Sequence, residues 1–237
     1  MSGLIIAIDG PAGSGKSTVA RLVAERLGIV YIDTGAMYRA IALKALQAGI
    51  SWGDEAALTD LAESCHITLA GLCLGEGGMW QSQVLLDGVD VSNAIRTHHI
   101  SEGASRVSAW PGVRQALLEK QREYARNNSV VMDGRDIGTV VLPHAQVKIF
   151  LTASLDERAR RRVNELVRRG RGGEAVFEQI RADLESRDAN DSGRAVAPLK
   201  PAADAILLDT TSMTIPEVVQ RIIDIANQAT GTTDAKG

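Results

Sequence analysis

The sequence is poor in aromatic residues and in cysteine. Phe, Trp and Tyr make up only 3% of its 237 residues, so we expect an aliphatic core. The two cysteines, Cys65 and Cys73, form neither a C-x-x-C pair nor a disulfide framework. This pattern favours a reducing compartment, and we expect a cytoplasmic protein.

An excess of positive charge and long apolar runs are also missing. The formal net charge is −3, whereas domains that bind nucleic acid are usually basic. No apolar run approaches the roughly 18 residues of a membrane-spanning helix, and no signal peptide precedes the first predicted strand. We expect no nucleic-acid or membrane partner, and a monomer that binds small molecules.

The most informative stretch lies near the N-terminus. Residues 4–8 predict a short buried strand, and residues 10–17 (GPAGSGKS) match the phosphate-binding pattern G-x-x-x-x-G-K-[ST]. Glycines let successive N–H groups point inward, and the helix that follows adds the positive end of its dipole. Lys16 can reach the outer phosphates of a nucleotide, and the Ser17 hydroxyl can bind Mg²⁺. A nucleoside triphosphate is the predicted ligand.

Alternating strands and helices predict a parallel sheet. The five expected core strands cover residues 4–8, 29–32, 130–133, 147–151 and 205–208. Ligands of such sheets gather at the carboxyl ends of the strands. Asp33, Thr34, Tyr38 and Arg39 fall at one such end, where Arg39 is a candidate phosphate ligand or a solvated helix arginine.

A second charged edge follows the strand at residues 130–133. Asp133-Gly-Arg135-Asp136 places two carboxylates and one guanidinium there. The segment is either part of the ligand site or a turn closed by an internal ion pair.

Between these strands the character of the chain changes. Residues 49–97 predict a short helix and a hairpin around Asp87-Gly88, which we interpret as an inserted α+β module. Residues 100–126 predict helix interrupted near Pro111. Thr214-Ile-Pro-Glu217 predicts a capping box at the start of the last helix.

Arginines are concentrated in the predicted helix at residues 154–169. The segment is either a solvated basic face, paired in part by Glu157 and Glu165, or a lid that closes over triphosphate charge. Residues 170–173 predict a flexible glycine-rich break, and residues 174–187 a further helix.

Other nucleotide-binding classes lack support in the sequence. There is no N-K-x-D segment typical of GTPases, no L-S-G-G-Q-like segment typical of ABC ATPases, and no evident pair for covalent catalysis. Many arginines near one triphosphate indicate a second anionic substrate, so the pattern favours a kinase whose acceptor is a phosphate.

At this level of detail the chain resembles the bacterial cytidylate kinases of the nucleoside monophosphate kinase family. The segments that carry the resemblance cover nearly the whole chain in family order: IDGPAGSGKST (8–18), DTGAMYRA (33–40), DGVDVSNAIRT (87–97), PGVRQALLEKQR (111–122), DGRDIGTVVLP (133–143), VKIFLTAS (147–154), ERARRR (157–162) and SRDANDSGRAVAPLKPAADAILLDT (186–210).

The resemblance implies an α/β fold, a five-stranded parallel sheet flanked by helices as in P-loop kinases, with a lid and an inserted α+β monophosphate-binding module. The implied domains are a core of residues 1–35, 100–153 and 200–237, a monophosphate-binding region of residues 36–99 with the inserted module, and a lid region of residues 154–199.

The resemblance also implies roles for individual residues. The ATP-binding residues would be Gly10, Pro11, Ala12, Gly13, Ser14, Gly15, Lys16, Ser17 and Thr18, and the catalytic residues would be Lys16, Arg161 and Arg162. The CMP-binding residues would be Thr34, Arg39, Ser105, Arg114, Asp133, Arg135, Asp136, Arg187, Asp191 and Arg194. Within this set Arg39, Arg135 and Arg194 would hold the phosphate, Arg187 and Asp191 would lie at the sugar and phosphate, and Ser105, Arg114 and Asp136 would contact cytosine.

The implied reaction is transfer of the γ-phosphoryl of ATP to CMP or dCMP, with Mg²⁺ bound to ATP and to Ser17. Two alternatives remain open at this point. A kinase of a small hydroxylated metabolite, such as shikimate or gluconate, would need a base near its acceptor. A non-enzymatic ATP-binding regulator would need no acceptor site.

Overall fold

The computed structural model of the protein describes residues 3–74, 80–168, 170 and 176–231. The chain divides into two compact units. Unit 1 comprises residues 1–32 and 124–237, and unit 2 comprises residues 33–123. Residues 100–123, which the sequence analysis placed with the core domain, fall in unit 2.

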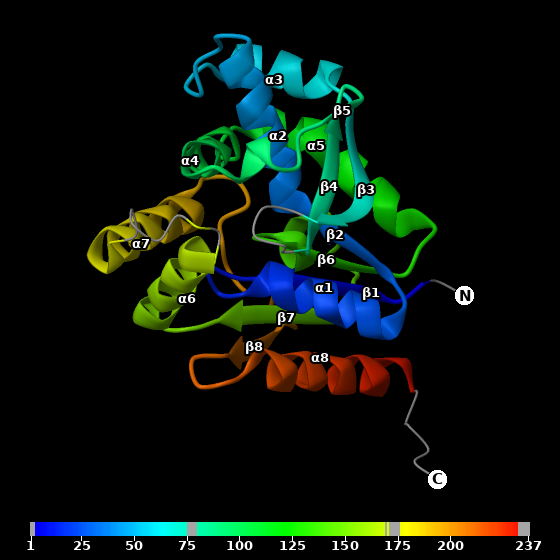
Figure 1. The fold of residues 1–237 in the computed structure, drawn as a ribbon. Helices are drawn as coiled ribbons and strands as arrows, with labels where there is room; N and C mark the ends of the chain where they lie inside the picture. The colour runs from blue at the N-terminus through cyan, green and yellow to red at the C-terminus, as the bar shows by residue number, and fades with distance from the viewer. Residues whose placement is uncertain (1–2, 75–79, 169, 171–175, 232–237) are drawn as a thin grey trace. The chain divides into compact units, whose positions relative to one another are not determined.

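Unit 1 is built on a five-stranded sheet with the order β2-β6-β1-β7-β8 (Figure 1). The strands are β1 (Ile5–Asp9), β2 (Val30–Asp33), β6 (Val130–Gly134), β7 (Val147–Thr152) and β8 (Ile206–Asp209). β1 pairs in parallel with β6 and with β7, and β7 pairs in parallel with β8. Each of the five strands expected from the sequence is present, and the parallel arrangement is confirmed.

Alternation along the strands explains how the helices pack on this sheet. Ile6 and Ile8 of β1, with Ile149 and Leu151 of β7, lie on one face and form a buried cluster with helices α1 (Lys16–Leu27) and α8 (Ile215–Thr230). Residues two apart in a strand point to the same face, so this face is apolar throughout. α6 (Leu155–Arg168) and α7 (Phe177–Gly193) form a separate small cluster with Ala12.

Most helix boundaries agree with expectation, and α7 does not. The sequence predicts helix over residues 174–187, but α7 runs from Phe177 to Gly193, so Asp191 lies inside the helix rather than after it. Residues 174–175 lie outside the described residues, as do 171–173 of the predicted glycine-rich break. A π-helical turn, η3 (Ile137–Val141), follows β6 and was not predicted.

Unit 2 has its own core and its own sheet. Its elements are α2 (Thr34–Gln47), α3 (Glu55–Ser64), β3 (Ile67–Leu74), β4 (Trp80–Leu86), β5 (Val89–Asp90), η2 (Ala94–Arg96), α4 (His98–Val107) and most of α5 (Pro111–Arg126). The three strands form an antiparallel sheet, and the turn between β4 and β5 uses Asp87 and Gly88 at φ of 51° and 83°. These angles match the predicted tight hairpin.

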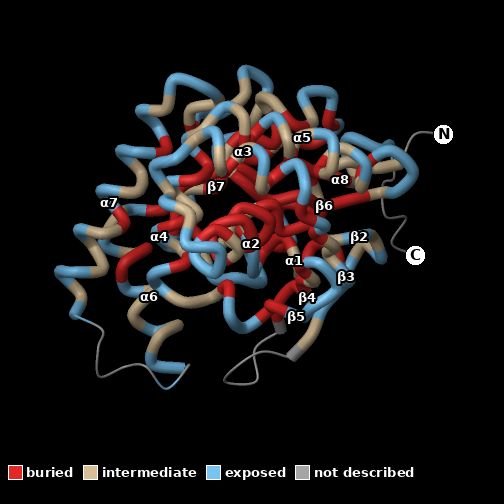
Figure 2. The backbone as a smooth tube through the Cα atoms, turned by 90° about the horizontal axis from the view of Figure 1, so that it is seen from above, coloured by how far each residue is buried: buried red, intermediate tan, exposed pale blue. Residues whose placement is uncertain are grey.

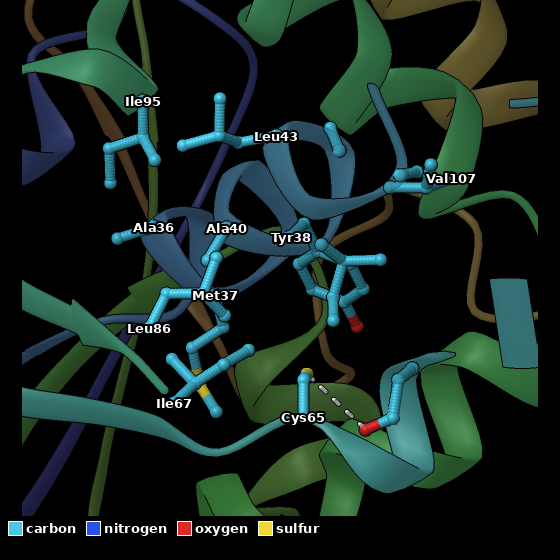
Figure 3. Close-up of a cluster of buried hydrophobic side chains, with 14 of the residues drawn as sticks. Ala36, Met37, Tyr38, Ala40, Leu43, Cys65, Ile67, Leu86, Ile95 and Val107 are labelled. Carbon is cyan, nitrogen blue, oxygen red and sulfur yellow. Dashed lines mark hydrogen bonds between the residues drawn. The ribbon is translucent and has the colours of Figure 1, made fainter. Parts of the chain in front are cut away.

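The core of unit 2 surrounds α2. Nine of the fourteen residues of α2 are buried, and Met37, Ala40 and Leu43 are among those drawn in Figure 3. A helix that is apolar on nearly all sides is one that other elements enclose. α2 therefore anchors this unit, and its first two turns carry the predicted site residues Thr34 and Arg39.

Burial follows these two cores (Figure 2). β6 is buried over its whole length, whereas in α7 only Leu184 and Asp191 are buried. Among the described residues no helix is long and apolar enough to cross a membrane.

Candidate active site

The phosphate-binding loop follows β1, as the sequence predicts. Gly10 lies at a φ of 149°, and a Cβ there would come within 2.0 Å of the Leu151 carbonyl oxygen. No other residue fits so close to β7. Gly15 takes a φ of 91°, a left-handed conformation that glycine adopts freely, and α1 starts at the next residue. The loop thus ends at a helix N-terminus, where backbone N–H groups attract anions.

Lys16 lies inside this loop. Its Nζ donates hydrogen bonds to the Pro11 carbonyl oxygen at 2.7 Å and to Ser14 Oγ at 3.4 Å. Burial, and then the guanidinium of Arg135, lower the pKa of Lys16 to about 7, although Asp133, Asp9 and Asp191 act in the opposite direction. An amine with this pKa gains a proton readily when a phosphate arrives beside it.

Ser17 and Asp133 bring two oxygen ligands together at the start of α1. Ser17 Oγ donates to Asp133 Oδ2 at 2.9 Å, and the Tyr31 hydroxyl donates to Asp133 Oδ1 at 2.9 Å. Hydroxyl and carboxylate oxygens are the ligands that Mg²⁺ prefers, usually with several waters retained. No group of three or more His, Cys, Asp or Glu side chains suited to a metal occurs among the described residues. Ser17 and Asp133 together supply two oxygen ligands that could hold such an ion.

Asp9 holds the turn that follows β6. Its two carboxylate oxygens accept hydrogen bonds from the backbone N–H groups of Ile137 and Gly138, both at 2.8 Å. Burial raises the pKa of Asp9 to about 6, and the negative charge of Asp136 acts in the same direction. The two hydrogen bonds lower this pKa but only partly offset the effect of burial. No role for Asp9 was predicted from the sequence, whereas in the structure it orients the residues after Asp136.

Three arginines surround one carboxylate at the end of α7. Arg135 Nε donates to Asp191 Oδ2 at 2.8 Å, Arg194 Nε donates to the Asp191 carbonyl oxygen at 3.2 Å, and Arg194 Nη1 lies 4.0 Å from Asp191 Oδ1. Burial and the charge of Arg135 lower the pKa of the third arginine, Arg187, whose Nε is buried without a hydrogen-bond partner. The positive charge of this group exceeds its negative charge, so the group suits an anionic ligand.

Another shared carboxylate organises the predicted residues of unit 2. Asp33 Oδ2 accepts from Arg39 at 2.8 Å and from Arg96 at 3.0 Å, while Asp33 Oδ1 accepts from the Ala36 backbone N–H at 3.0 Å. Asp33 therefore both caps α2 and fixes two guanidinium groups. Arg96 was missed by the sequence analysis, because it lies 63 residues from Asp33 and no local pattern joins the two.

The residues expected to contact cytosine in unit 2 lie on α4 and α5. The Oγ of Ser105 is buried without a hydrogen-bond partner. The Arg114 guanidinium lies 5.5 Å above the centre of the Tyr38 ring, and its Nη1 donates to the Ser108 carbonyl oxygen at 3.2 Å. A stacked and hydrogen-bonded arginine is held in one orientation. The third expected cytosine contact, Asp136, belongs to unit 1, where it is buried.

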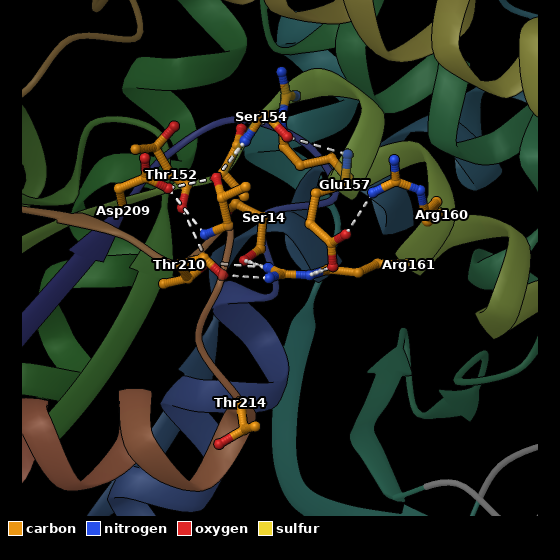
Figure 4. Close-up of polar contacts among 12 residues, drawn as sticks. Ser14, Thr152, Ser154, Glu157, Arg160, Arg161, Asp209, Thr210 and Thr214 are labelled. Carbon is orange, nitrogen blue, oxygen red and sulfur yellow. Dashed lines mark hydrogen bonds and ion pairs between the residues drawn. The ribbon is translucent and has the colours of Figure 1, made fainter.

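The arginines of α6 have different surroundings. Arg161 donates from Nε to Glu157 at 3.0 Å, from Nη1 to the Ser14 carbonyl oxygen at 3.2 Å and from Nη2 to the Thr210 carbonyl oxygen at 2.6 Å (Figure 4). Arg162 pairs with Glu165 at 2.6 Å on its own helix. The guanidinium of Arg161 thus lies against the phosphate-binding loop, as expected of a residue that acts there, whereas Arg162 makes its ion pair within α6.

The model of the family described as cytidylate kinase matches residues 6–228. This range contains every site residue predicted from the sequence. The chain belongs to the cytidylate kinase family.

Curated relatives and a solved structure agree with this assignment. A cytidylate kinase of Desulforamulus reducens is 54% identical over 92% of this chain and 94% of its own length. One of Desulfitobacterium hafniense is 51% identical over 94% of this chain and 93% of its own. An uncharacterized protein from Eubacterium ventriosum shares the fold alone, with a TM-score of 0.50 and 14% identity over 95% of this chain and 98% of its own.

Proposed function

We propose that this member of the cytidylate kinase family is a cytoplasmic enzyme that transfers the γ-phosphoryl of ATP to CMP or dCMP, giving ADP and CDP or dCDP. One observation carries the proposal. In a chain of this family, a phosphate-binding loop lies in the same unit as three arginines, Arg135, Arg187 and Arg194, whose charges all act on the carboxylate of Asp191. Such a group is suited to an acceptor that is itself a phosphate.

On the donor side, the backbone N–H groups of residues 13–18 and the ammonium of Lys16 hold the ATP phosphates, whereas Pro11 has no N–H group and that of Ala12 donates to Asp188. Ser17 Oγ would hold Mg²⁺ there. To it we add a carboxylate oxygen of Asp133, which the family resemblance assigns to CMP, because the two atoms lie 2.9 Å apart and are both hard oxygen ligands. When bound, that ion would supply positive charge beside the ATP phosphates.

On the acceptor side, the proposal assigns the CMP phosphate to Arg39, Arg135 and Arg194, the sugar to Arg187 and Asp191, and the base to Ser105, Arg114 and Asp136. Two buried polar atoms support it. Ser105 Oγ and Arg187 Nε have no hydrogen-bond partner. Buried polar groups nearly always have one, so a ligand with hydroxyl, carbonyl or phosphate groups accounts for both.

The chemistry needs positioning and charge more than proton transfer. The phosphate of CMP is already deprotonated near neutral pH, so its oxygen attacks the γ-phosphorus without a general base. Lys16 and Arg161 stabilise the negative charge that spreads over the γ-phosphoryl oxygens. For Arg161 this requires exchanging a carbonyl oxygen, such as that of Thr210, for a phosphate oxygen.

One assay tests the proposal against its alternatives. Release of ADP is followed with ATP and, in turn, CMP, dCMP, UMP, AMP and shikimate. We expect CMP and dCMP to be the preferred acceptors. Preference for shikimate would instead indicate a small-metabolite kinase, and ATP binding without release of ADP for any acceptor would indicate a regulator.

A further inference from the structure

Two helices of unit 1 hold the phosphate-binding loop at one residue, Ala12. We propose that Arg158 of α6 and Asp188 of α7 are positioning residues for ATP, which fix the loop in its phosphate-binding shape by bonding both backbone groups of Ala12. The inference rests on the proposed ATP site, and neither residue is among those assigned to either nucleotide.

The contacts form a closed ring. Asp188 Oδ1 accepts from the Ala12 N–H at 3.2 Å, and Arg158 Nη1 donates to the Ala12 carbonyl oxygen at 3.0 Å. The same Nη1 also donates to Asp188 Oδ2. A further hydrogen bond fixes the side chain of Arg158, because its Nε donates to the Ala153 carbonyl oxygen at 3.0 Å. Each backbone group of Ala12 therefore meets a side chain whose own position is set.

Packing reinforces this ring. Ala12 forms a buried cluster with Ala159 of α6 and Leu184 of α7. At Gly13 a Cβ would lie 3.3 Å from the Cβ of Arg158 and 3.5 Å from Leu184, so the helices touch the loop there too. The side chain of Arg158 is only 9% exposed, unlike a solvated basic face.

Such a ring matters because the loop is rich in glycine. Gly13 and Gly15 adopt positive φ angles and would sample many conformations if nothing held them. A loop ordered before the ligand arrives avoids the loss of freedom that ordering on binding would cost. Arg158 also neutralises the carboxylate of Asp188, which would otherwise place unpaired negative charge next to the loop that receives phosphates.

The same two helices provide a matched control. Arg181 of α7 pairs with Asp156 of α6 at 2.8 Å, with side chains 39% and 55% exposed. This ion pair joins the helices at the surface. Its removal shows whether ATP binding depends on any ion pair between α6 and α7, or only on the pair that also bonds the loop.

The experiment measures ATP binding by calorimetry without an acceptor, and KM for each nucleotide, in the full chain. The variants are R158Q, D188N, the double variant and the control D156N. Asn at 188 keeps the shape of the side chain but turns an N–H group toward Arg158. We expect the Kd for ATP to rise about tenfold or more in R158Q and D188N, the range typical of losing a partner behind a ligand-holding group.

Three further results are expected. The double variant should bind ATP no more weakly than either single variant, because one ring is broken in all three. D156N should bind ATP like the wild type. R158Q should keep its KM for CMP, since α6 carries none of the residues assigned to CMP.

Other outcomes overturn the inference. Unchanged ATP affinity in R158Q and D188N, with a lower melting temperature only, would make the pair merely structural. Equal rises in KM for both nucleotides in R158Q would do the same. The proposed function fails separately, if the wild type binds ATP and phosphorylates none of the nucleoside monophosphates.

Discussion

At the scale of single residues, the charged groups of the site are held by partners distant in the sequence. Asp33 joins Arg39 to Arg96, Asp191 joins Arg135 to Arg194, and Asp9 caps a turn 128 residues away. Each carboxylate keeps cationic or N–H groups in a fixed place before a ligand binds. A substitution at one of these carboxylates should therefore affect the particular groups that it holds.

Lys16→Met removes the ammonium and keeps an unbranched side chain. Turnover should fall roughly 10²-fold or more, the range for losing one electrostatic stabiliser of a transition state. The melting temperature should not fall, because burial already disfavours the charge of Lys16 and lowers its pKa to about 7. Steady-state kinetics and thermal unfolding measure the two effects, and wild-type turnover would contradict the role of the loop.

Asp136→Asn tests the identity of the base. A carboxylate accepts from the amino group of cytosine and repels the carbonyl of uracil, whereas an amide can donate to that carbonyl. The CMP to UMP ratio of kcat/KM should shift by about 1–3 kcal/mol toward UMP, as for one polar contact to a base edge. If Asp136 only shapes the turn after β6, both nucleotides should lose activity equally and the ratio should stay constant.

Asp33→Asn tests the carboxylate that Arg39 and Arg96 share. Burial would raise the pKa of Asp33, but Arg39 first and then Arg96 hold it below its ordinary value. A lowered pKa contributes stability above the unfolded value near 4, and this contribution is lost as pH falls through the folded value. Asn still caps α2, so the substitution removes the charge but not the cap.

At neutral pH the Asn variant should therefore lose about 2–3 kcal/mol, the worth of a hydrogen bond to a charged group. The difference from wild type should shrink as pH falls below about 4, because the unfolded wild-type carboxyl then takes up a proton, and it should vanish only below the lowered pKa of the folded carboxyl. Urea unfolding at pH 7 and at pH 3.5 measures both values. A difference that stays constant with pH would show that the charge of Asp33 does not act on stability.

At the scale of elements, local sequence patterns predicted most of the strands and helices. Strand and helix positions were predicted within a few residues, because apolar spacing, capping residues and the Asp87-Gly88 turn all act over a few positions. The start of α5 at Pro111 and the capping box of α8 were both correct. The π-helical turn η3 and the extension of α7 to Gly193 have no local signature, since distant packing decides them.

The site was predictable only where it has a local pattern. The phosphate-binding loop and the D-G-R-D segment were found by their spacing. Arg96 and Asp188 were not, because their partners lie 63 and 176 residues away. Sequence order carries no information on which of many arginines meets which carboxylate.

Thr214→Ala tests the capping box of α8. Its backbone N–H and its hydroxyl both donate to a carboxylate oxygen of Glu217 at 2.8 Å, within the capping box at the start of α8. We expect a loss of about 1 kcal/mol in the free energy of unfolding, the usual worth of an N-cap. Thr230→Ala at the other end of α8 is the control, since its hydroxyl donates to carbonyl oxygens of Ala226 and Asn227 in the last turns of the helix and does not cap its start. Equal losses in both variants would contradict a role for the cap.

At the scale of the whole molecule, the two units differ in which of the predicted site residues and which of the tryptophans they contain. The phosphate-binding loop belongs to unit 1, whereas Trp52, Trp80 and Trp110 all belong to unit 2. Each unit also has its own buried cluster. Tryptophan fluorescence therefore follows unit 2, while far-UV circular dichroism follows the helices of both.

ATP without CMP should consequently stabilise unit 1 more than unit 2. At about 100 times its Kd, a ligand that binds only the folded form adds roughly 2.7 kcal/mol to the stability of what it binds. With ATP, we expect the circular dichroism transition in urea to extend to higher urea concentrations than the fluorescence transition. Without ATP, the two transitions should lie closer together. Lys16→Met, with its weakened phosphate site, should show a smaller separation. Coincident transitions that move together under ATP would instead mean that the two units unfold as one cooperative structure.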